Sequence, residues 1–399
     1  MITSRERKRD RQPIGLLIAL ILAACVVAGC IRITNEYAAI PPGMWRATLD
    51  LTASPVSEAE FDERTQGQLP FNFEVIYSDQ DAFHIEVING EERIVITDIR
   101  FGLDVRRGRD TIQIDFPVYG SYIRADYEED AIEGYWYVPS RGPDYRIPFR
   151  ALHGKLRRFD HSVAEPTINV DGRWKAMFEV ETNDPYPAIG YFRQQGDSLT
   201  GTFLTETGDY RFLEGNVMGD RMFLSVFDGA HAFLFEAKQL EDGTLSGIFR
   251  SGNHYKTYWS AARSDTFTLR DPYTLTYLNE GYDAFDFTAE TLDGETVSLS
   301  DARYQGRPKL VQIFGTWCPN CRDETAFLVE YLKKHDTGDL AVIALAFERY
   351  RDKTRAREAI RTYQDYFDIP YEVLYAGPSS KSAASELLPS LNRVISYPT

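Results

Sequence analysis

Two cysteines, Cys318 and Cys321, are separated by two residues and follow closely on a short apolar run. That run, residues 309–314 (KLVQIF), predicts a buried strand, and residues 315–317 (GTW) predict a turn into a helix that opens at Pro319. At a helix N-terminus, unpaired backbone N–H groups and the helix dipole stabilise a thiolate. The spacing therefore predicts a strand–turn–helix unit in which Cys318 attacks disulfides and Cys321, one turn further in, resolves the mixed disulfide.

A pair of this spacing can also be half of a zinc site or a structural disulfide. A zinc site needs two further Cys or His ligands at short spacing. The nearest His is His335, fourteen residues beyond Cys321, and the sequence has no second CxxC. A disulfide across so small a loop gains little chain entropy. We therefore interpret the pair as a redox-active disulfide that works without a metal or a separate cofactor.

Two segments around the pair carry a family resemblance: residues 285–301 (FDFTAETLDGETVSLSD) and residues 310–324 (LVQIFGTWCPNCRDE). They resemble the TlpA/ResA-like family of membrane-anchored, thioredoxin-fold thiol–disulfide oxidoreductases of the bacterial cell envelope. The resemblance covers about residues 281–399 and implies an α/β thioredoxin-like domain there. It also implies disulfide-bearing protein substrates and an envelope electron donor. It says nothing about residues 40–265.

The resemblance bears on the proton that Cys321 must lose. In thioredoxin a buried Asp lies six residues before the first Cys and serves the resolving thiol, but this chain has Gln312 there, which cannot titrate. Glu324, three residues after Cys321, matches the acidic residue that the family carries after its CxxC. If partial burial raises its pKa, the carboxylate can take the proton of Cys321. The alternative is a solvated Glu favoured by the helix dipole.

The last residues, 395–399 (ISYPT), resemble the cis-proline motif of the family. We expect Tyr397 and Pro398 to face the redox pair and to form the substrate-facing surface together with Trp317 and Pro319. In the family this motif is followed by a strand hairpin and a final helix. The resemblance therefore implies a thioredoxin-like domain that is incomplete at its C-terminus.

Two function classes remain open. The first is an envelope thiol–disulfide oxidoreductase that reduces protein disulfides. The alternative is a ligand-binding or scaffold lipoprotein whose β domains carry the main function, with an auxiliary thioredoxin module. A peroxiredoxin shares the lead-in at residues 292–299 (LDGETVSL), but it needs a Thr three residues before its peroxidatic Cys, where this chain has Gly315. We therefore set that third class aside.

The N-terminus has the pattern of a targeting segment. Residues 5–11 (RERKRDR) are mostly basic, and an apolar run follows from residue 14. Small residues before Cys30 resemble a lipoprotein cleavage box with Cys30 as the lipidated residue, and Cys25 is the alternative site. An uncleaved anchor is also open, because residues 14–31 are nearly long enough to span a bilayer. Either way residues 1–30 tether an exported body to the membrane, on the periplasmic side.

Charge and cysteine content agree with export. The chain carries a formal charge of −16; residues 1–29 contain five basic and two acidic groups, so the body without them carries about −19. An acidic body argues against nucleic-acid binding. Since Cys25 and Cys30 lie in the leader, the body keeps only the redox pair and avoids scrambled disulfides.

Residues 40–265 have an all-β texture, with alternating aromatic and β-branched residues and regular Gly, Asn and Asp turns. The region looks duplicated: Gly-Met-Trp45 recurs as Gly-Arg-Trp174. We predict repeats at residues 40–155 and 168–265, each a meander closed into a calycin-like barrel. A single sandwich built from both copies is the alternative. We expect the large aromatic side chains of this region to fill its core. No two of its histidines are spaced two or four residues apart, so we predict no metal site there.

Within residues 281–399, a helix is predicted at residues 319–335 and a strand at 339–347. A second helix follows that strand and ends at about residue 366, and a strand near 371–374 and a helix near 381–391 come after it. Strands that alternate with helices favour a parallel α/β sheet with the CxxC at the carboxyl end of a strand. We expect Phe327, Leu328 and Leu332 to face that sheet. Residues 264–281 are expected to connect the two regions.

Overall fold

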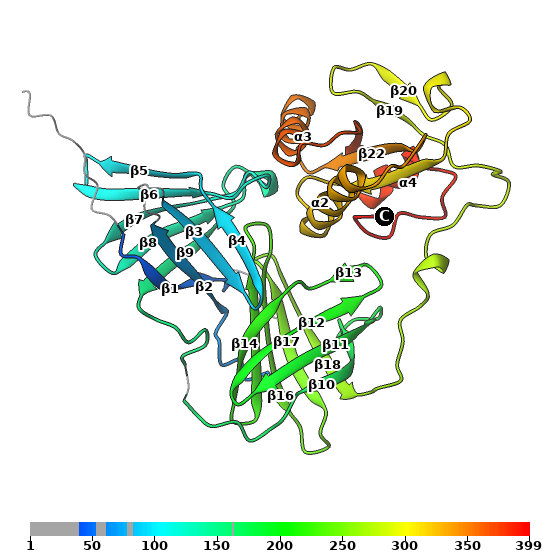
Figure 1. Cartoon of the computed structure of the whole chain (residues 1–399). Helices are drawn as coiled ribbons and strands as arrows, with labels where there is room; N and C mark the ends of the chain where they lie inside the picture. The colour runs from blue at the N-terminus through cyan, green and yellow to red at the C-terminus, as the bar shows by residue number, and fades with distance from the viewer. Residues whose placement is uncertain (1–39, 53–60, 78–82, 162) are drawn as a thin grey trace, which may run out of the picture. The chain divides into compact units, whose positions relative to one another are not determined.

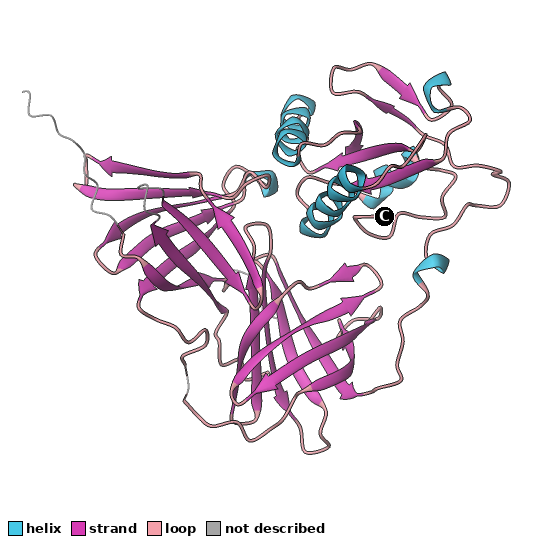
Figure 2. Ribbon diagram, viewed as in Figure 1, coloured by secondary structure: helices cyan, strands magenta, loops and turns pink. Residues whose placement is uncertain are grey.

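The computed structural model describes residues 40–52, 61–77, 83–161 and 163–399. Residues 40–399 make up one compact unit. It contains two nine-stranded sheets and one five-stranded sheet (Figures 1 and 2). The predicted leader, with Cys25 and Cys30, lies outside the described residues. Among those that are described, no helix is both long and apolar enough to cross a membrane.

The first sheet is an antiparallel meander in the order β4-β3-β2-β1-β9-β8-β7-β6-β5. Its strands are β1 (Gly43–Asp50), β2 (Gln68–Tyr77), β3 (Phe83–Asn89), β4 (Glu92–Ile96), β5 (Ile99–Asp104), β6 (Arg109–Asp115), β7 (Tyr122–Glu128), β8 (Ala131–Tyr137) and β9 (Arg146–His153). The two edge strands, β4 and β5, are not paired with each other in this sheet. The prediction of a closed barrel is therefore wrong for the first copy.

The physical reason is that the second copy completes this core. Phe227 of the second copy belongs to the same buried cluster as Trp136 and Phe71 of the first. Its ring centroid lies 4.4 Å from that of Phe71 and 5.0 Å from that of Trp136. The apolar interior of the open sheet is thus covered by side chains from another sheet rather than by closure.

The second sheet does close, because β11 also pairs with β12. Its strands are β10 (Gly172–Phe178), β11 (Tyr186–Gln195), β12 (Ser198–Thr205), β13 (Gly208–Asp209), β14 (Leu213–Met218), β15 (Arg221–Phe227), β16 (Ala232–Gln239), β17 (Leu245–Ser251) and β18 (Tyr255–Arg263). The short β13 pairs with β12 at the end of the sheet. The interior is filled by aromatic rings, among them Phe178, Phe203, Phe235 and Trp259.

The sequence repeat falls on equivalent places in the two sheets. Trp45 of β1 and Trp174 of β10 are both fully buried. The indole N–H of Trp45 donates to the Pro41 carbonyl at 3.0 Å, and that of Trp174 donates to the Val170 carbonyl at 2.9 Å. Each Trp therefore anchors its first strand to the carbonyl four residues earlier, which explains why the motif recurs.

The third sheet has the order β20-β19-β23-β22-β21, with β21, β22 and β23 parallel. Its elements are β19 (Thr288–Glu290), β20 (Thr296–Ser298), β21 (Lys309–Phe314), α2 (Pro319–Lys334), β22 (Ala341–Glu348), α3 (Lys353–Phe367), β23 (Glu372–Pro378) and α4 (Lys381–Leu387). Alternate residues of β22 face two separate apolar clusters: one includes Ala384 of α4 and the other includes Ile360 of α3. This is the predicted parallel α/β domain with thioredoxin-like character.

One predicted contact of the CxxC helix is wrong. Leu328 is buried, but the Phe327 side chain is 63% exposed. The buried positions of α2 after its first turn are Cys321, Thr325, Leu328 and Val329, which repeat with the helical period. Phe327 lies off that stripe.

Candidate active site

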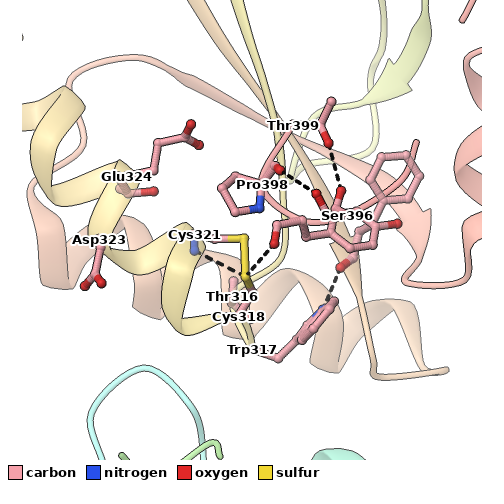
Figure 3. Close-up of a disulfide and its surroundings, with 12 residues drawn as sticks. Thr316, Trp317, Cys318, Cys321, Asp323, Glu324, Ser396, Pro398 and Thr399 are labelled. Carbon is pink, nitrogen blue, oxygen red and sulfur yellow. Dashed lines mark hydrogen bonds between the residues drawn. A yellow bond between two sulfur atoms is a disulfide. The ribbon is translucent and has the colours of Figure 1, made fainter. Parts of the chain in front are cut away.

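The redox pair lies at the start of α2, directly after β21 and a three-residue turn (Figure 3). Cys318 is the N-cap residue, and its Sγ accepts a hydrogen bond from the backbone N–H of Cys321 at 3.2 Å. The two residues are joined as a disulfide with a Cα–Cα distance of 5.2 Å. Cys318 is 5% exposed and Cys321 is 0% exposed, so Cys318 offers the accessible sulfur. The N-terminal position favours its thiolate once reduced.

The loop at residues 396–399 lies against the pair, and Pro398 faces the disulfide in Figure 3. The carbonyl oxygen of Tyr397 is 3.3 Å from the Cys318 Sγ, and the Tyr397–Pro398 peptide bond is cis. The Tyr397 ring meets the Trp317 ring edge-on with centroids 5.5 Å apart. Pro319 is buried in the first turn of α2. All four residues predicted to face the substrate thus gather around the pair.

Gln312 of β21 and Glu324 of α2 are hydrogen-bonded to each other. Gln312 is buried in β21, and its side-chain amide donates to the Glu324 carboxylate at 2.8 Å and to the Thr325 hydroxyl at 3.2 Å. Burial raises the pKa of Glu324, and the hydrogen bond from Gln312 opposes part of that effect. In Figure 3 Glu324 and Asp323 point to opposite sides of α2. Glu324 is therefore half-buried and hydrogen-bonded rather than fully solvated.

The sequence reasoning missed Glu348, the last residue of β22. Its carboxylate accepts hydrogen bonds from the Thr316 backbone N–H at 3.0 Å and the Thr316 hydroxyl at 2.9 Å. Thr316 lies two residues before Cys318, so Glu348 holds the turn that leads to Cys318. Burial raises the pKa of Glu348 to about 7. An acidic residue at the carboxyl end of the neighbouring buried strand was the signal in the sequence.

Arg349 lies beside this carboxyl group. Its guanidinium carbon is 3.9 Å from the centroid of the Trp317 ring. Burial, together with the nearby Arg141, lowers the pKa of Arg349 to about 9. The Trp317 indole N–H in turn donates to the Phe347 carbonyl at 2.9 Å. Trp317, the residue before Cys318, is therefore held by the Arg349 guanidinium over its ring and by a hydrogen bond at the ring edge.

The turn also has no room for the Thr of a peroxiredoxin at position 315. A Cβ on Gly315 would lie 2.7 Å from the Phe347 carbonyl oxygen and closer still to the Trp317 indole. Contacts this short are essentially never seen for real Cβ atoms. A side chain at position 315 would therefore require this turn to shift.

Within the described ranges, no group of three or more His, Cys, Asp or Glu side chains is arranged to hold a metal ion. The chemistry that the site offers is that of the dithiol and its disulfide. It needs two sulfur atoms, a proton acceptor and a path for the substrate.

Comparison with known proteins gives matches to this C-terminal region. Residues 281–384 match the AhpC/TSA family model. The thioredoxin-like protein YneN of Bacillus subtilis strain 168 is 34% identical over 97 residues, which is 24% of this chain and 54% of that protein. The thiol–disulfide oxidoreductase ResA of Bacillus thuringiensis subsp. konkukian strain 97-27 is 25% identical over 93 residues, 23% of this chain and 49% of ResA. The chain thus spans about half the length of these curated relatives.

Among solved structures, a thiol:disulfide interchange protein of the thioredoxin family from Chlorobium tepidum TLS is similar to this chain. It is 24% identical, with a TM-score of 0.23, and the match covers 29% of this chain and 72% of that one.

Proposed function

Since its C-terminal domain belongs with the TlpA/ResA-like thiol–disulfide oxidoreductases, we propose that this protein reduces disulfides of other proteins in the bacterial cell envelope. The observation that carries the proposal is the Cys318–Cys321 disulfide at the N-terminus of α2, faced by the Tyr397 carbonyl. We assign residues 40–155 and 168–265 to two β domains, of which the second is of calycin-like type, and residues 281–399 to the redox domain.

The reaction begins with the reduced pair. The Cys318 thiolate attacks one sulfur of a substrate disulfide, and the substrate's other sulfur leaves as a thiolate that takes up a proton. Cys321 then loses its proton and attacks the Cys318 sulfur. The mixed disulfide breaks, the second substrate thiol is released, and the Cys318–Cys321 disulfide forms. Two electrons pass to the substrate, and an envelope electron donor returns the protein to the dithiol.

The roles follow the geometry. Cys318 is the nucleophile, because its sulfur is the more exposed and lies at the positive end of the helix. Glu324 takes the proton of Cys321, one helical turn away. Burial raises the pKa of Glu324, which favours a carboxylate that must accept a proton from Cys321 and later return it. Trp317, Tyr397 and Pro398 form the surface that meets the substrate, and Pro319, also predicted there, is buried in the first turn of α2.

An insulin-reduction assay on the full chain tests this function. The wild type should catalyse reduction and Cys318→Ser should not. Equal rates would refute the proposal. The redox potential of the pair then decides direction: a potential near that of thioredoxin, about −270 mV, supports a reductant, and one near that of DsbA, about −120 mV, an oxidant.

The location is part of the proposal. We propose that the N-terminal leader tethers the body to the membrane, on its periplasmic side, through lipidation at Cys30 or, alternatively, Cys25. In a bacterial host the protein should fractionate with membranes and be open to protease added to spheroplasts. Protection from that protease would refute export. Loss of lipid labelling in Cys30→Ala, with labelling kept in Cys25→Ala, would identify the site.

The alternative function, ligand binding by the β domains, gains no support from the second barrel. Rings fill its interior: the centroids of Phe203 and Phe235 lie 4.9 Å apart, and those of Phe203 and Trp259 lie 5.1 Å apart. A small barrel packed with large side chains is a core rather than a ligand cavity.

A further inference from the structure

A cleft of about 810 Å³ opens over Cys318. It has walls from two parts of the compact unit, the second β-barrel and the redox domain. Its lining includes Tyr186, Tyr210 and Phe233 on the barrel side and Trp317, Cys318 and Tyr397 on the redox side. The accessible sulfur thus lies in a cleft whose walls carry aromatic side chains, whereas Cys321 is fully buried.

The hairpin between β12 and β13 comes close to the redox motif itself. Gly208 has a φ of +131°. A Cβ at this position would lie 2.7 Å from the side-chain amide nitrogen of Asn320, the residue directly before Cys321. A side chain would not fit there without a shift. Thr207, at the exposed tip of this hairpin, also lines the cleft. The barrel therefore reaches the place where a substrate must arrive.

A buried cation joins the barrel to the CxxC helix. The Arg211 side chain is 3% exposed and forms ion pairs with Asp323 of α2 and Glu92 of β4. Its Nε is also 3.8 Å from the carboxylate of Asp228. Burial by itself lowers the pKa of Arg211, but the carboxylates of Asp228, Glu92 and Asp323 outweigh it and raise the pKa.

An unpaired buried charge is costly, whereas one with several partners is held in place. Since the partners of Arg211 come from α2 and from the first sheet, this side chain fixes the barrel edge relative to the redox pair. Asp323 lies two residues after Cys321 and faces away from Glu324. The ion pair between Arg211 and Asp323 is therefore on the side of α2 opposite to Glu324.

We propose that the second β-barrel forms one wall of the substrate cleft, and that this wall selects extended disulfide-bearing polypeptide segments with an aromatic side chain next to the disulfide. The inference rests on the proposed function and names its substrate class. The sulfur exchange is the one described above, so no further reactant is needed. Tyr186 and Tyr210, whose hydroxyls lie 2.7 Å apart, would pack against the aromatic side chain of the substrate.

The test compares a polypeptide with a small disulfide. Reduced full-length protein is mixed with insulin or with hydroxyethyl disulfide, and the second-order rate constants are measured. Thr207→Trp narrows the cleft at an exposed hairpin tip. It should lower the ratio of the insulin rate to the hydroxyethyl disulfide rate by at least about tenfold. Glu241→Trp, at an exposed turn of the same barrel away from the cleft, is the matched control and should keep the wild-type ratio.

A second arm tests the substrate class with two disulfide peptides that differ in one residue beside the Cys, Phe in one and Ser in the other. The wild type should prefer the Phe peptide by about fivefold or more, and Thr207→Trp should reduce that preference. The inference would be overturned if Thr207→Trp kept the wild-type ratio of the insulin rate to the hydroxyethyl disulfide rate. It would also be overturned if the wild type reduced the two peptides at equal rates. If the wild type reduces neither insulin nor hydroxyethyl disulfide, the proposed function itself is wrong.

Discussion

Replacing Glu348 by Gln tests how the buried carboxyl group supports the nucleophile turn. Glu348 is 1% exposed and its pKa is raised by burial from 4.5 to about 7. A folded-state pKa above the unfolded value means that the native protein binds the proton more tightly. The stabilisation is therefore fully present below pH 4.5 and is lost as the pH rises through about 7. The difference between the two pKa values corresponds to ~3 kcal/mol.

Gln is a close mimic of the protonated Glu348. Its carbonyl can accept from the Thr316 N–H, and its amide can donate to the Thr316 hydroxyl, but it does not titrate. We expect Glu348→Gln to gain stability relative to the wild type as the pH rises from 5 to 8, by about 2–3 kcal/mol. A change in hydrogen bonding that is the same at every pH cancels when the difference in free energy of unfolding between variant and wild type is compared at two pH values.

The assay is urea unfolding of the full chain at pH 5, 6, 7 and 8, with the redox domain followed by pulse proteolysis. Glu358→Gln, which removes an exposed carboxyl group from α3, is the control and should show no such trend. A difference between Glu348→Gln and wild type that stays constant with pH would refute the reasoning. So would a variant that becomes less stable with rising pH, because Glu348 would then be ionised and stabilised as an anion.

Three further predictions concern the redox pair and the first strand of the barrel. In the reduced protein iodoacetamide should label Cys318 before Cys321, with an apparent thiol pKa below about 8.5; faster labelling of Cys321 would reverse the two roles. Glu324→Gln should slow turnover near neutral pH by roughly a hundredfold and leave the first labelling rate of Cys318 unchanged, whereas an unaffected turnover would show that another group takes the proton. Trp174→Ala should lower the free energy of unfolding of the β-barrel by about 3–5 kcal/mol, measured by urea unfolding; a loss below about 1 kcal/mol would mean that the barrel closes without this anchor.

Local sequence patterns predicted the redox region well. The run at residues 309–314 forms β21, and α2 begins at Pro319 with Cys318 as its N-cap, because strand and helix starts depend on neighbouring residues. The resemblance also led to Tyr397, which lies against Cys318 although the two residues are 79 positions apart. Phe327 is apolar but lies off the helical stripe that α2 buries, which is why it is exposed although Leu328 beside it is buried.

What only the tertiary structure decided involves pairs that are distant in the sequence. Glu348 meets Thr316 across 32 positions because β22 lies beside β21 in the sheet. Arg211 meets Asp323 across 112 positions. The periodicity of the sequence does not predict these two contacts, because they depend on how strands and helices that are distant in the sequence pack together.

The two β copies make the same point. Their alternating pattern and the recurring Trp45 and Trp174 were sufficient to predict two meanders from the sequence. Whether a meander closes depends on what fills its core. The second copy closes through β11 and β12, while the first stays open between its edge strands, with Phe227 of the second copy buried in its core. Strand pattern is a local property of the chain, whereas closure is settled by the packing of apolar surface between sheets.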